Sequence, residues 1–284
     1  MSLKVIVSSR NINLRKYTSI KIGGKAKYFF EADTVDDICR IISDFDNSYY
    51  LLGGGSNLLI KDVLIDKPVI KLASAFNYTR KSWDCVEVGA AIPISHLLRY
   101  CLKNNLGGLE NLAGIPATVG GALAMNVSSF GRDIFACLEA VEILDREGKI
   151  KRLNREQIQF GYRYSSLGGK IVLRAWFKFY PEKNIKTKIN SFLDKRFQAQ
   201  DFGFPSCGCI FKNPSSFTAG FLIDSCGLKG ARRGDAQISS KHANFIVNLN
   251  RAKYEDVDYL ICKIKDKVYQ KHEIILEEEI KRWI

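Results

Sequence analysis

The chain has 284 residues, of which 46% are hydrophobic, and its 43 Lys and Arg outnumber its 30 Asp and Glu to give a formal net charge of +13. This length suits two or three compact units. No apolar run approaches the roughly 20 residues of a membrane span, and the first apolar run is too short for a secretory signal, so we expect a cytoplasmic protein with no membrane partner.

The excess of positive charge admits a nucleic-acid-binding protein as an alternative, because Lys and Arg supply the sequence-independent part of such affinity. The lysines are dispersed along predicted helices, however, and no basic patch interleaved with aromatic residues is present. A basic surface also favours small anionic ligands. We therefore expect an anionic small-molecule substrate and no nucleic-acid partner.

Eight cysteines are scattered without the spacing of a disulfide framework, so we predict free thiols in a reducing compartment. Cys207 and Cys209 are separated by one residue, and no His or second Cys pair lies nearby at the spacing of a zinc site. We predict no metal.

The first predicted unit, residues 1–67, is a small α+β arrangement with strands at 28–31 and 49–52. Between the strands, Thr34 three residues before Asp37 predicts a capping box at the start of a helix with an apolar face. The second strand leads into a segment that we predict to bind phosphate, comprising Gly53, Gly54, Gly55, Ser56, Asn57 and Leu58. Glycines favour this because successive N–H groups can turn towards one point. A plain turn between strands remains the alternative.

The second predicted unit, residues 68–183, contains a similar segment. Its candidate phosphate-binding residues are Gly114, Ile115, Pro116, Thr118, Gly120, Gly121 and Asn126. Two such loops in one chain suggest one long dinucleotide, although neither matches the Rossmann fingerprint or the P-loop. Around the loop we expect strands at 69–72 and 86–88, a helix at 95–104, a hairpin of 138–144 with 150–153, and a strand at 171–179.

The third predicted unit, residues 184–284, opens with a polar helix at 185–200. A short helix at 219–226, a strand at 245–247 and a last strand at 274–276 are also expected. A long helix before the last strand carries one apolar stripe that we predict to face the core, formed by Val257, Leu260, Ile261, Ile264 and Val268.

Seven segments, in this order, resemble the UDP-N-acetylenolpyruvoylglucosamine reductases, a flavoenzyme family of peptidoglycan precursor synthesis: residues 18–24, 53–57, 114–126, 161–165, 208–214, 241–245 and 276–279. The resemblance spans nearly the whole chain. It implies an α+β fold with a two-part FAD-binding region of the vanillyl-alcohol-oxidase/PCMH type and a C-terminal α+β substrate domain. It also implies FAD between the first two units, NADPH as hydride donor and a UDP-sugar enolpyruvyl ether as substrate.

The implied reaction adds hydride to a vinyl carbon and leaves an enediolate, which needs a cation to stabilise it and an acid to protonate the adjacent carbon. By resemblance, Arg163 supplies the cation and Glu279 aligns with the family's catalytic Glu beside the intermediate, with Glu277 as the alternative alignment. Cys209 occupies the position where many members carry a proton-donating Ser. The substrate-binding residues implied by the same motifs are Lys212, Asn213 and Tyr162.

Several features depart from the family pattern or limit the assignment. Ala117 replaces a usual Gly, and residues 127–129 replace a smaller Ala/Gly run. The stretch from Arg163 to Cys209 is too short for the tyrosine-bearing substrate loop of one branch, so the chain resembles the branch that lacks it. No His or Cys in the two phosphate loops is placed to attach the flavin, so we predict non-covalent FAD. We interpret His242 as structural, and another FAD-dependent oxidoreductase of the same superfamily remains the alternative.

Overall fold

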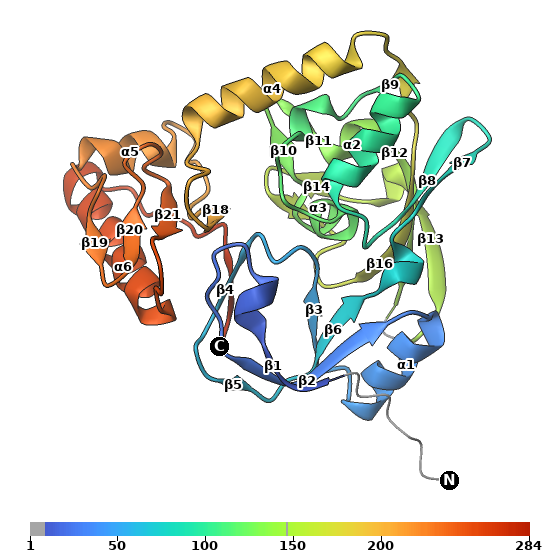
Figure 1. Ribbon diagram of the computed structural model, residues 1–284, viewed down its shortest axis with the longest axis horizontal. Coiled ribbons are helices and arrows are strands. Elements are labelled where there is room, and N and C mark those ends of the chain that lie inside the picture. The colour runs from blue at the N-terminus through green and yellow to red at the C-terminus, as the bar shows by residue number, and fades with distance from the viewer. Residues whose placement is uncertain (1–8, 146) are drawn as a thin grey trace. The chain divides into compact units, whose positions relative to one another are not determined.

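The computed structural model describes residues 9–145 and 147–284, which form two compact units built from separate segments (Figure 1). Unit 1 contains residues 28–54 and 67–195 together with residues 9–10. Unit 2 contains residues 11–27, 55–66 and 196–284. Parts of the first predicted unit therefore fold with the C-terminal residues, while the three-part division at 67/68 and 183/184 stays a prediction.

A short parallel sheet in unit 1 contains the three strands predicted at the start of the chain. It pairs β6 (Val69–Leu72) with both β2 (Lys25–Ala32) and β3 (Tyr50–Leu52). Helix α1 (Val35–Asp44) begins with the predicted capping box of Thr34 and Asp37. Its apolar face packs with Phe30 and Ile70 because the helical period places Ile38, Ile41 and Ile42 on one side.

An antiparallel sheet forms the centre of unit 1, in the strand order β13-β12-β16-β8-β7. The strands are β7 (Thr79–Ser82), β8 (Cys85–Gly89), β12 (Leu138–Leu144), β13 (Ile150–Asn154) and β16 (Ile171–Phe177). Helix α3 (Val119–Met125) contacts β8 and β16, and α2 (Ile94–Lys103) shares the same buried core. The predicted hairpin is confirmed, and the second phosphate loop leads into a short helix that the sequence did not reveal.

The remaining elements of unit 1 are short. Three strand pairs are β9 (Leu106–Gly107) with β17 (Tyr180–Pro181), β10 (Ser128–Ser129) with β11 (Arg132–Asp133), and β14 (Phe160–Gly161) with β15 (Tyr164–Ser165). Helix α4 (Ile185–Ala199) contains the boundary between the units. The 3-10 helices of the described chain lie at Leu14–Tyr17, Ser74–Phe76, Glu110–Leu112, Ile134–Cys137 and Arg155–Gln157.

Unit 2 is built on a second antiparallel sheet in the order β18-β21-β20-β19. Its strands are β18 (Ser206–Cys209), β19 (Arg232–Arg233), β20 (Ala236–Ile238) and β21 (Phe245–Asn248). Helix α6 (Tyr254–His272) packs against β19, β20 and α5 (Ala219–Ser225), seen in orange and red in Figure 1. The apolar stripe predicted on this long helix is fully buried, as expected.

The predicted last strand at 274–276 is wrong. Ile275 is 83% exposed, and the terminal strand is instead β22 (Lys281–Trp283), where Trp283 is buried. β22 pairs in parallel with β4 (Leu58–Ile60), which lies more than 200 positions earlier in the chain. The other short strands associated with unit 2 are β5 (Leu64–Ile65), paired with the first residues of β2, and β1 (Ser9–Asn13).

Among the described residues, no helix combines the length and the apolar character that crossing a membrane requires. All eight cysteines are free thiols. No group of three or more His, Cys, Asp or Glu side chains in the described ranges could hold a metal ion.

Candidate active site

The two predicted phosphate loops meet in unit 1 through their backbones. A Cβ on Gly53 would lie 2.9 Å from the Thr118 hydroxyl, and a Cβ on Gly54 would lie 2.8 Å from the carbonyl oxygen of Pro116. Real Cβ atoms do not approach other atoms this closely, so Gly54 is required for the two backbones to touch, whereas the close contact at Gly53 is with the Thr118 side chain. Segments that are about 60 residues apart in sequence therefore form one backbone-lined surface.

The second loop is held in place by main-chain bonds. Gly114 has a φ of +82°, which favours glycine, and the Ala117 carbonyl accepts a hydrogen bond from the N–H of Ile94 at 2.9 Å. The N–H of Gly120 donates to Ala90 at 2.9 Å, and Gly121 donates to the hydroxyl of Thr118 at 3.4 Å. Ile115 lies in the same loop, where its N–H donates to Leu112. The departure from Gly at Ala117 is accommodated, because Ala117 is largely buried and is not among the residues of the described chain with a positive φ.

Asn126 ends the α3 segment in a left-handed conformation, with a φ of +45°. Its side-chain amide donates to the Gly161 carbonyl at 2.7 Å, which joins this loop to the β14–β15 turn. The buried Oδ1 atom of Asn126 accepts no hydrogen bond from the described residues. A buried acceptor without a partner is costly, so a bound ligand that donates a hydrogen bond here would relieve that cost.

Arg163 lies with Tyr162 in the two-residue turn between β14 and β15. Its φ of +54° is uncommon for a residue with a Cβ and is typical of strained functional turns. The Arg163 Nη1 group donates to the Ser128 hydroxyl at 2.7 Å and to the Ser128 carbonyl at 3.1 Å. The guanidinium lies 5.2 Å from the centre of the Tyr162 ring, which is itself half exposed.

In unit 2 the end of the first phosphate loop is joined to the C-terminal segment. The Asn57 amide donates to the carbonyl of Glu279 at 3.0 Å, and the N–H of Lys281 donates to the Asn57 carbonyl at 2.9 Å. Gly55 has a φ of +62°, and its carbonyl accepts from the N–H of Ser19. Ser56 precedes Asn57, and Leu58 begins strand β4. The predicted cofactor residue Asn57 and the predicted catalytic residue Glu279 are therefore direct neighbours.

The Cys209 segment runs antiparallel to the same C-terminal residues. The N–H of Glu279 donates to Ile210 at 2.8 Å, and the N–H of Lys212 donates to Glu277 at 2.9 Å. A β-bridge between Phe211 and Glu278 lies between these bonds. Residues 277–281 are consequently held between the first phosphate loop and the segment from Cys209 to Lys212. This arrangement brings Asn57, Cys209 and Glu279 into the same part of unit 2.

The three consecutive glutamates have different surroundings. The Glu278 carboxylate bonds to Arg282 at 2.7 Å and to Lys265. Burial alone would raise the pKa of Glu278, but the hydrogen bonds from these two cations hold it below its ordinary value. Glu277 pairs with the Lys212 ammonium. Because side chains alternate along an extended segment, Glu277 and Glu279, the two candidates, project to the side opposite Glu278.

The two neighbouring cysteines also differ. Burial raises the pKa of the Cys207 thiol to about 12, with smaller contributions from Cys209 and Glu279. Cys207 is fully buried in the core, whereas Cys209 is partly exposed. Only Cys209 thus has both access and a position beside Glu279.

Arg196 was not among the predicted site residues. Its side chain is buried near the end of α4, and burial lowers its pKa while the charge of Cys209 acts in the opposite direction. The guanidinium therefore lies within electrostatic range of the thiol. No local pattern predicts this buried position, because an Arg in a polar helix ordinarily faces solvent.

The remaining predicted residues have definite partners. The Asn213 side-chain oxygen accepts from the N–H of Ala219 at 3.0 Å, which orients its amide. The His242 ring packs at 4.6 Å from Phe245, and burial lowers its pKa, with the charge of Lys229 acting in the same direction. His242 is therefore neutral at ordinary pH, which agrees with a structural role without testing it.

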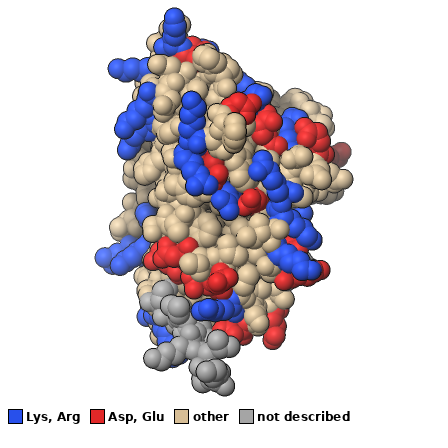
Figure 2. All heavy atoms as spheres, turned by 90° about the vertical axis from the view of Figure 1, so that its right-hand side faces the viewer, with Lys and Arg blue, Asp and Glu red and all other residues tan. Residues whose placement is uncertain are grey.

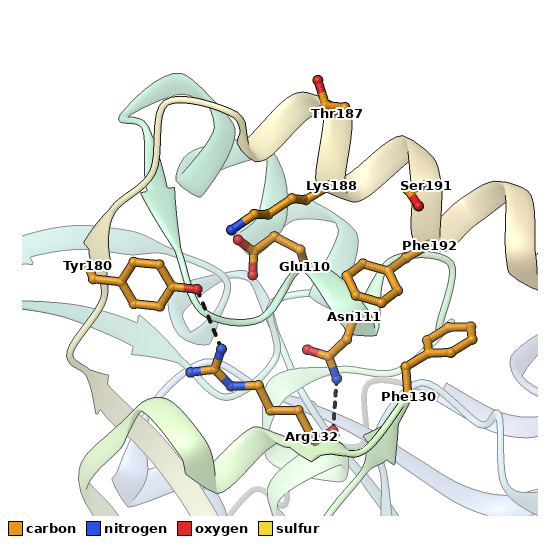
Figure 3. Close-up of a pocket in the computed structure, with 9 residues that line it drawn as sticks. All are labelled: Glu110, Asn111, Phe130, Arg132, Tyr180, Thr187, Lys188, Ser191 and Phe192. Atoms are coloured by element: carbon orange, nitrogen blue, oxygen red, sulfur yellow. Dashed lines mark hydrogen bonds between the residues drawn. The ribbon is translucent and has the colours of Figure 1, made fainter.

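A separate pocket of about 450 Å³ lies in unit 1 between α4 and the β10–β11 hairpin (Figure 3). It contains none of the predicted site residues. The buried Glu110 accepts from the N–H of Gly108 at 2.8 Å, while Arg132 donates to the Tyr180 hydroxyl at 3.5 Å across the pocket. The negative charge of Glu110 interacts with the positive charges of Arg132 and Lys188, which compensate it.

Two protein families match separate parts of the chain. Residues 27–154 match the FAD binding domain family, and residues 198–283 match the UDP-N-acetylenolpyruvoylglucosamine reductase, C-terminal domain. The chain thus has the organisation of a flavoprotein in which an FAD-binding region is followed by a family-specific C-terminal domain. The matched ranges contain both glycine loops and the strand that carries Cys209.

The curated relatives extend this similarity over nearly the whole chain. UDP-N-acetylenolpyruvoylglucosamine reductase of Thermotoga maritima is 39% identical over 273 residues, covering 94% of this chain and 95% of the relative. The Clostridium botulinum protein of the same name is 35% identical, covering 99% and 95%. The crystal structure of the Thermus caldophilus reductase superposes with a TM-score of 0.84 at 36% identity, covering 96% of this chain and 98% of that one. The chain belongs to the UDP-N-acetylenolpyruvoylglucosamine reductase family, which confirms the resemblance and the α+β fold.

Proposed function

We propose that this protein is an FAD-dependent oxidoreductase that uses NADPH to reduce UDP-N-acetyl-3-O-(1-carboxyvinyl)glucosamine to UDP-N-acetylmuramate. The observation that carries the proposal is the similarity to reductases of that name over 94% or more of the chain. The match of residues 198–283 to the C-terminal domain of this family favours it over another oxidoreductase of the FAD superfamily. The product is a peptidoglycan precursor, so we place the protein in the cytoplasm and in cell-wall synthesis, with consequences for cell shape and division.

The residues present fit FAD. Gly54 and Pro116 come into backbone contact, and glycines in the first loop allow the close approach that a pyrophosphate needs. The buried Oδ1 atom of Asn126 could accept a hydrogen bond from the cofactor. Residues of both loops would hold the cofactor without a covalent bond. When bound, FAD supplies the redox chemistry, accepting hydride from NADPH and giving it to the vinyl carbon.

Arg163, Glu279 and Cys209 have separable roles in this proposal. The guanidinium of Arg163 binds the substrate carboxylate, and it stabilises the negative charge that develops when the vinyl π electrons move towards that group. Glu279 lies beside the reacting carbons and orients them. The Cys209 thiol then gives its proton to the carbon next to the carboxylate, and solvent reprotonates the sulfur. A thiol, with an ordinary pKa of about 8.5, is a stronger acid than a Ser hydroxyl.

The basic surface suits an anionic substrate better than a nucleic acid. On the face shown in Figure 2, Lys and Arg side chains are interspersed with acidic and uncharged residues instead of forming one basic patch. A UDP-sugar, a dinucleotide and a carboxylate are all anions that a net charge of +13 attracts.

The decisive experiment is anaerobic NADPH oxidation by the purified protein, with and without the enolpyruvyl substrate. We expect a yellow protein whose flavin is released into solution by acid precipitation, and NADPH oxidation equal to the UDP-N-acetylmuramate formed. A colourless protein, or a flavoprotein whose NADPH oxidation does not depend on the substrate, would refute the proposed function.

A further inference from the structure

Arg163 and Ser128 are joined by two hydrogen bonds in the candidate site of unit 1. One guanidinium nitrogen, Nη1, donates to two oxygens of the same residue, the hydroxyl at 2.7 Å and the carbonyl at 3.1 Å. Both lengths lie in the range of well-formed hydrogen bonds, and the shorter one is typical of a charged donor. The carbonyl is common to every residue type, so only the hydroxyl depends on the identity of residue 128.

The place of Arg163 in the fold explains why a second anchor matters. The residue sits at the tip of a two-residue turn with a left-handed backbone, and its side chain is long and flexible. A guanidinium that must be ordered at each turnover loses conformational entropy, whereas one already held in place does not. A stabilising charge is effective only when it is positioned before the reaction.

Ser128 is held rigidly enough to act as such an anchor. It begins β10, and the β10–β11 hairpin is held by Asn111, whose amide donates to the carbonyls of Ser129 and Arg132, at 2.8 Å each. Figure 3 shows Asn111 reaching towards Arg132, with Phe130 of the same hairpin facing Phe192. The hairpin is therefore braced by contacts that do not involve Arg163.

A second bond connects the two turns directly. The Asn126 amide donates to the Gly161 carbonyl at 2.7 Å, two residues before each member of the Ser128–Arg163 pair. The β14–β15 turn and the start of β10 are consequently fixed to one another at two points. Loss of the Ser128 hydroxyl would remove the shorter of the two bonds from Arg163 and leave the bond to the Ser128 carbonyl and the Asn126–Gly161 bond in place.

We propose that Ser128 is a positioning residue that presents the Arg163 guanidinium to the substrate carboxylate. The inference rests on the proposed function. Residue 128 lies in the segment where the family resemblance implies smaller Ala or Gly residues, so the hydroxyl is a feature of this chain and not of the general pattern. Hydrogen bonds to charged groups are the stronger ones in proteins, and we expect loss of this one to slow substrate reduction about 10-fold.

The test compares Ser128→Ala, Ser128→Thr and the control Ser166→Ala in the FAD-loaded enzyme. The Ser166 hydroxyl accepts from the N–H of Gln159 beside the same turn but has no bond to Arg163, so its removal reports on the hairpin alone. Stopped-flow absorbance measures flavin reduction by NADPH and flavin reoxidation by the enolpyruvyl substrate separately. Titration of UDP-N-acetylmuramate into the oxidised enzyme, followed by the flavin spectrum, adds a readout that does not depend on turnover.

Ser128→Ala should slow reoxidation about 10-fold and weaken binding of the carboxylate product, with NADPH reduction and melting temperature unchanged. Ser128→Thr should restore both, and Ser166→Ala should match the wild type. In an Arg163→Ala background, Ser128→Ala should have no further effect on reoxidation, because the group it positions is gone. An undiminished 10-fold effect in that background, or an equal slowing of both half-reactions, would overturn the assignment.

Failure of the inference and failure of the proposed function give different results. A wild-type enzyme that returns hydride to the substrate, together with a Ser128→Ala variant that behaves identically, refutes the positioning role alone. A wild-type flavoprotein that NADPH reduces but the enolpyruvyl substrate never reoxidises refutes the function and the inference with it.

Discussion

The two units hold their candidate catalytic residues by different means. In unit 1, Arg163 lies on a strained two-residue turn and is fixed by bonds from its own side chain to Ser128. In unit 2, Cys209 and Glu279 lie on adjacent extended segments that are joined by main-chain bonds. Main-chain bonds survive a change of side chain, whereas side-chain bonds do not. Substitutions in unit 2 should therefore affect chemistry without moving the backbone, while those near Arg163 should affect position as well.

The largest effect is expected from Arg163→Ala and Glu279→Ala. Arg163→Ala removes the cation that stabilises the developing negative charge, and Glu279→Ala removes the group that orients the reacting carbons. Loss of one such preorganised group typically costs about 10²–10³ in rate. The loss should fall on flavin reoxidation by substrate, with flavin reduction by NADPH nearly intact, as stopped-flow absorbance measures. Glu279→Ala should keep the main-chain bonds of residue 279 to Ile210 and Asn57, because those bonds do not involve the side chain. Equal slowing of both half-reactions would indicate general damage instead.

The next effect separates acid function from packing at Cys209. Cys209→Ala should reduce substrate turnover about 10²-fold, the scale of a lost general acid, whereas Cys209→Ser should keep measurable activity. Cys207→Ala is the matched control. Burial raises the pKa of the Cys207 thiol to about 12, so this thiol is a poor acid and its removal should leave the rate per folded enzyme unchanged. Because Cys207 is buried in the core, its truncation should lower stability. If Cys207→Ala lost substrate turnover while keeping its normal flavin content, Cys207 and not Cys209 would be the proton donor.

Local sequence patterns predicted several elements of the fold correctly. Thr34 and Asp37 cap α1, and the apolar stripe of α6 is buried. The hydrophobic period of a helix or strand depends only on residues close in sequence, so it can be recognised before the fold is known. The family resemblance supplied the candidate residues themselves, and their catalytic roles stay predictions.

Contacts between distant segments could not be predicted. The Asn57–Glu279 bond joins residues 222 positions apart, and no local pattern marks residues 281–283 as the partner of β4. The apolar residues at 274–276 were a stronger strand signal, but pairing with β4 decides where the strand forms. Arg196 escaped notice for a related reason, because only the folded chain brings its side chain into a buried place near Cys209.

A smaller effect tests whether the backbone contact between the loops of unit 1 supports flavin binding. Gly54→Ala places a Cβ 2.8 Å from the Pro116 carbonyl, so the loops must separate, at a cost of about 1–3 kcal/mol. We expect FAD affinity of the apoprotein, measured by fluorescence titration, to fall by about 10-fold or more, and Gly54→Val to retain no flavin. Gly220→Ala is the control, because its nearest neighbour would be 3.8 Å away. Full flavin occupancy in Gly54→Val would show that the loop is only a turn.

The smallest effect concerns the ion pairs behind the C-terminal segment of unit 2. The folded pKa of Glu278 is lowered because hydrogen bonds from Arg282 and Lys265 outweigh its burial. A lowered folded pKa means that the carboxylate contributes stability above its unfolded pKa of about 4.3, and this contribution is lost as pH falls through the folded value. Glu278→Gln should therefore cost about 1 kcal/mol in urea unfolding at pH 7, because the pair is partly exposed.

The same substitution should reduce the sensitivity of stability to acid, since Gln does not titrate. Between pH 5 and pH 3 the wild type should lose more stability than Glu278→Gln, and the difference between the two proteins should shrink. Glu87→Gln in unit 1 provides the comparison, because Tyr78, Arg80 and Arg174 likewise hold the pKa of Glu87 below its ordinary value against the effect of burial. Neither Glu87 nor Glu278 is among the predicted site residues, and the main-chain bonds of the C-terminal segment do not depend on the Glu278 side chain, so both variants should leave substrate reduction unchanged. A Glu278→Gln enzyme whose stability falls with acid as steeply as the wild type would show that this carboxylate does not contribute to the pH dependence.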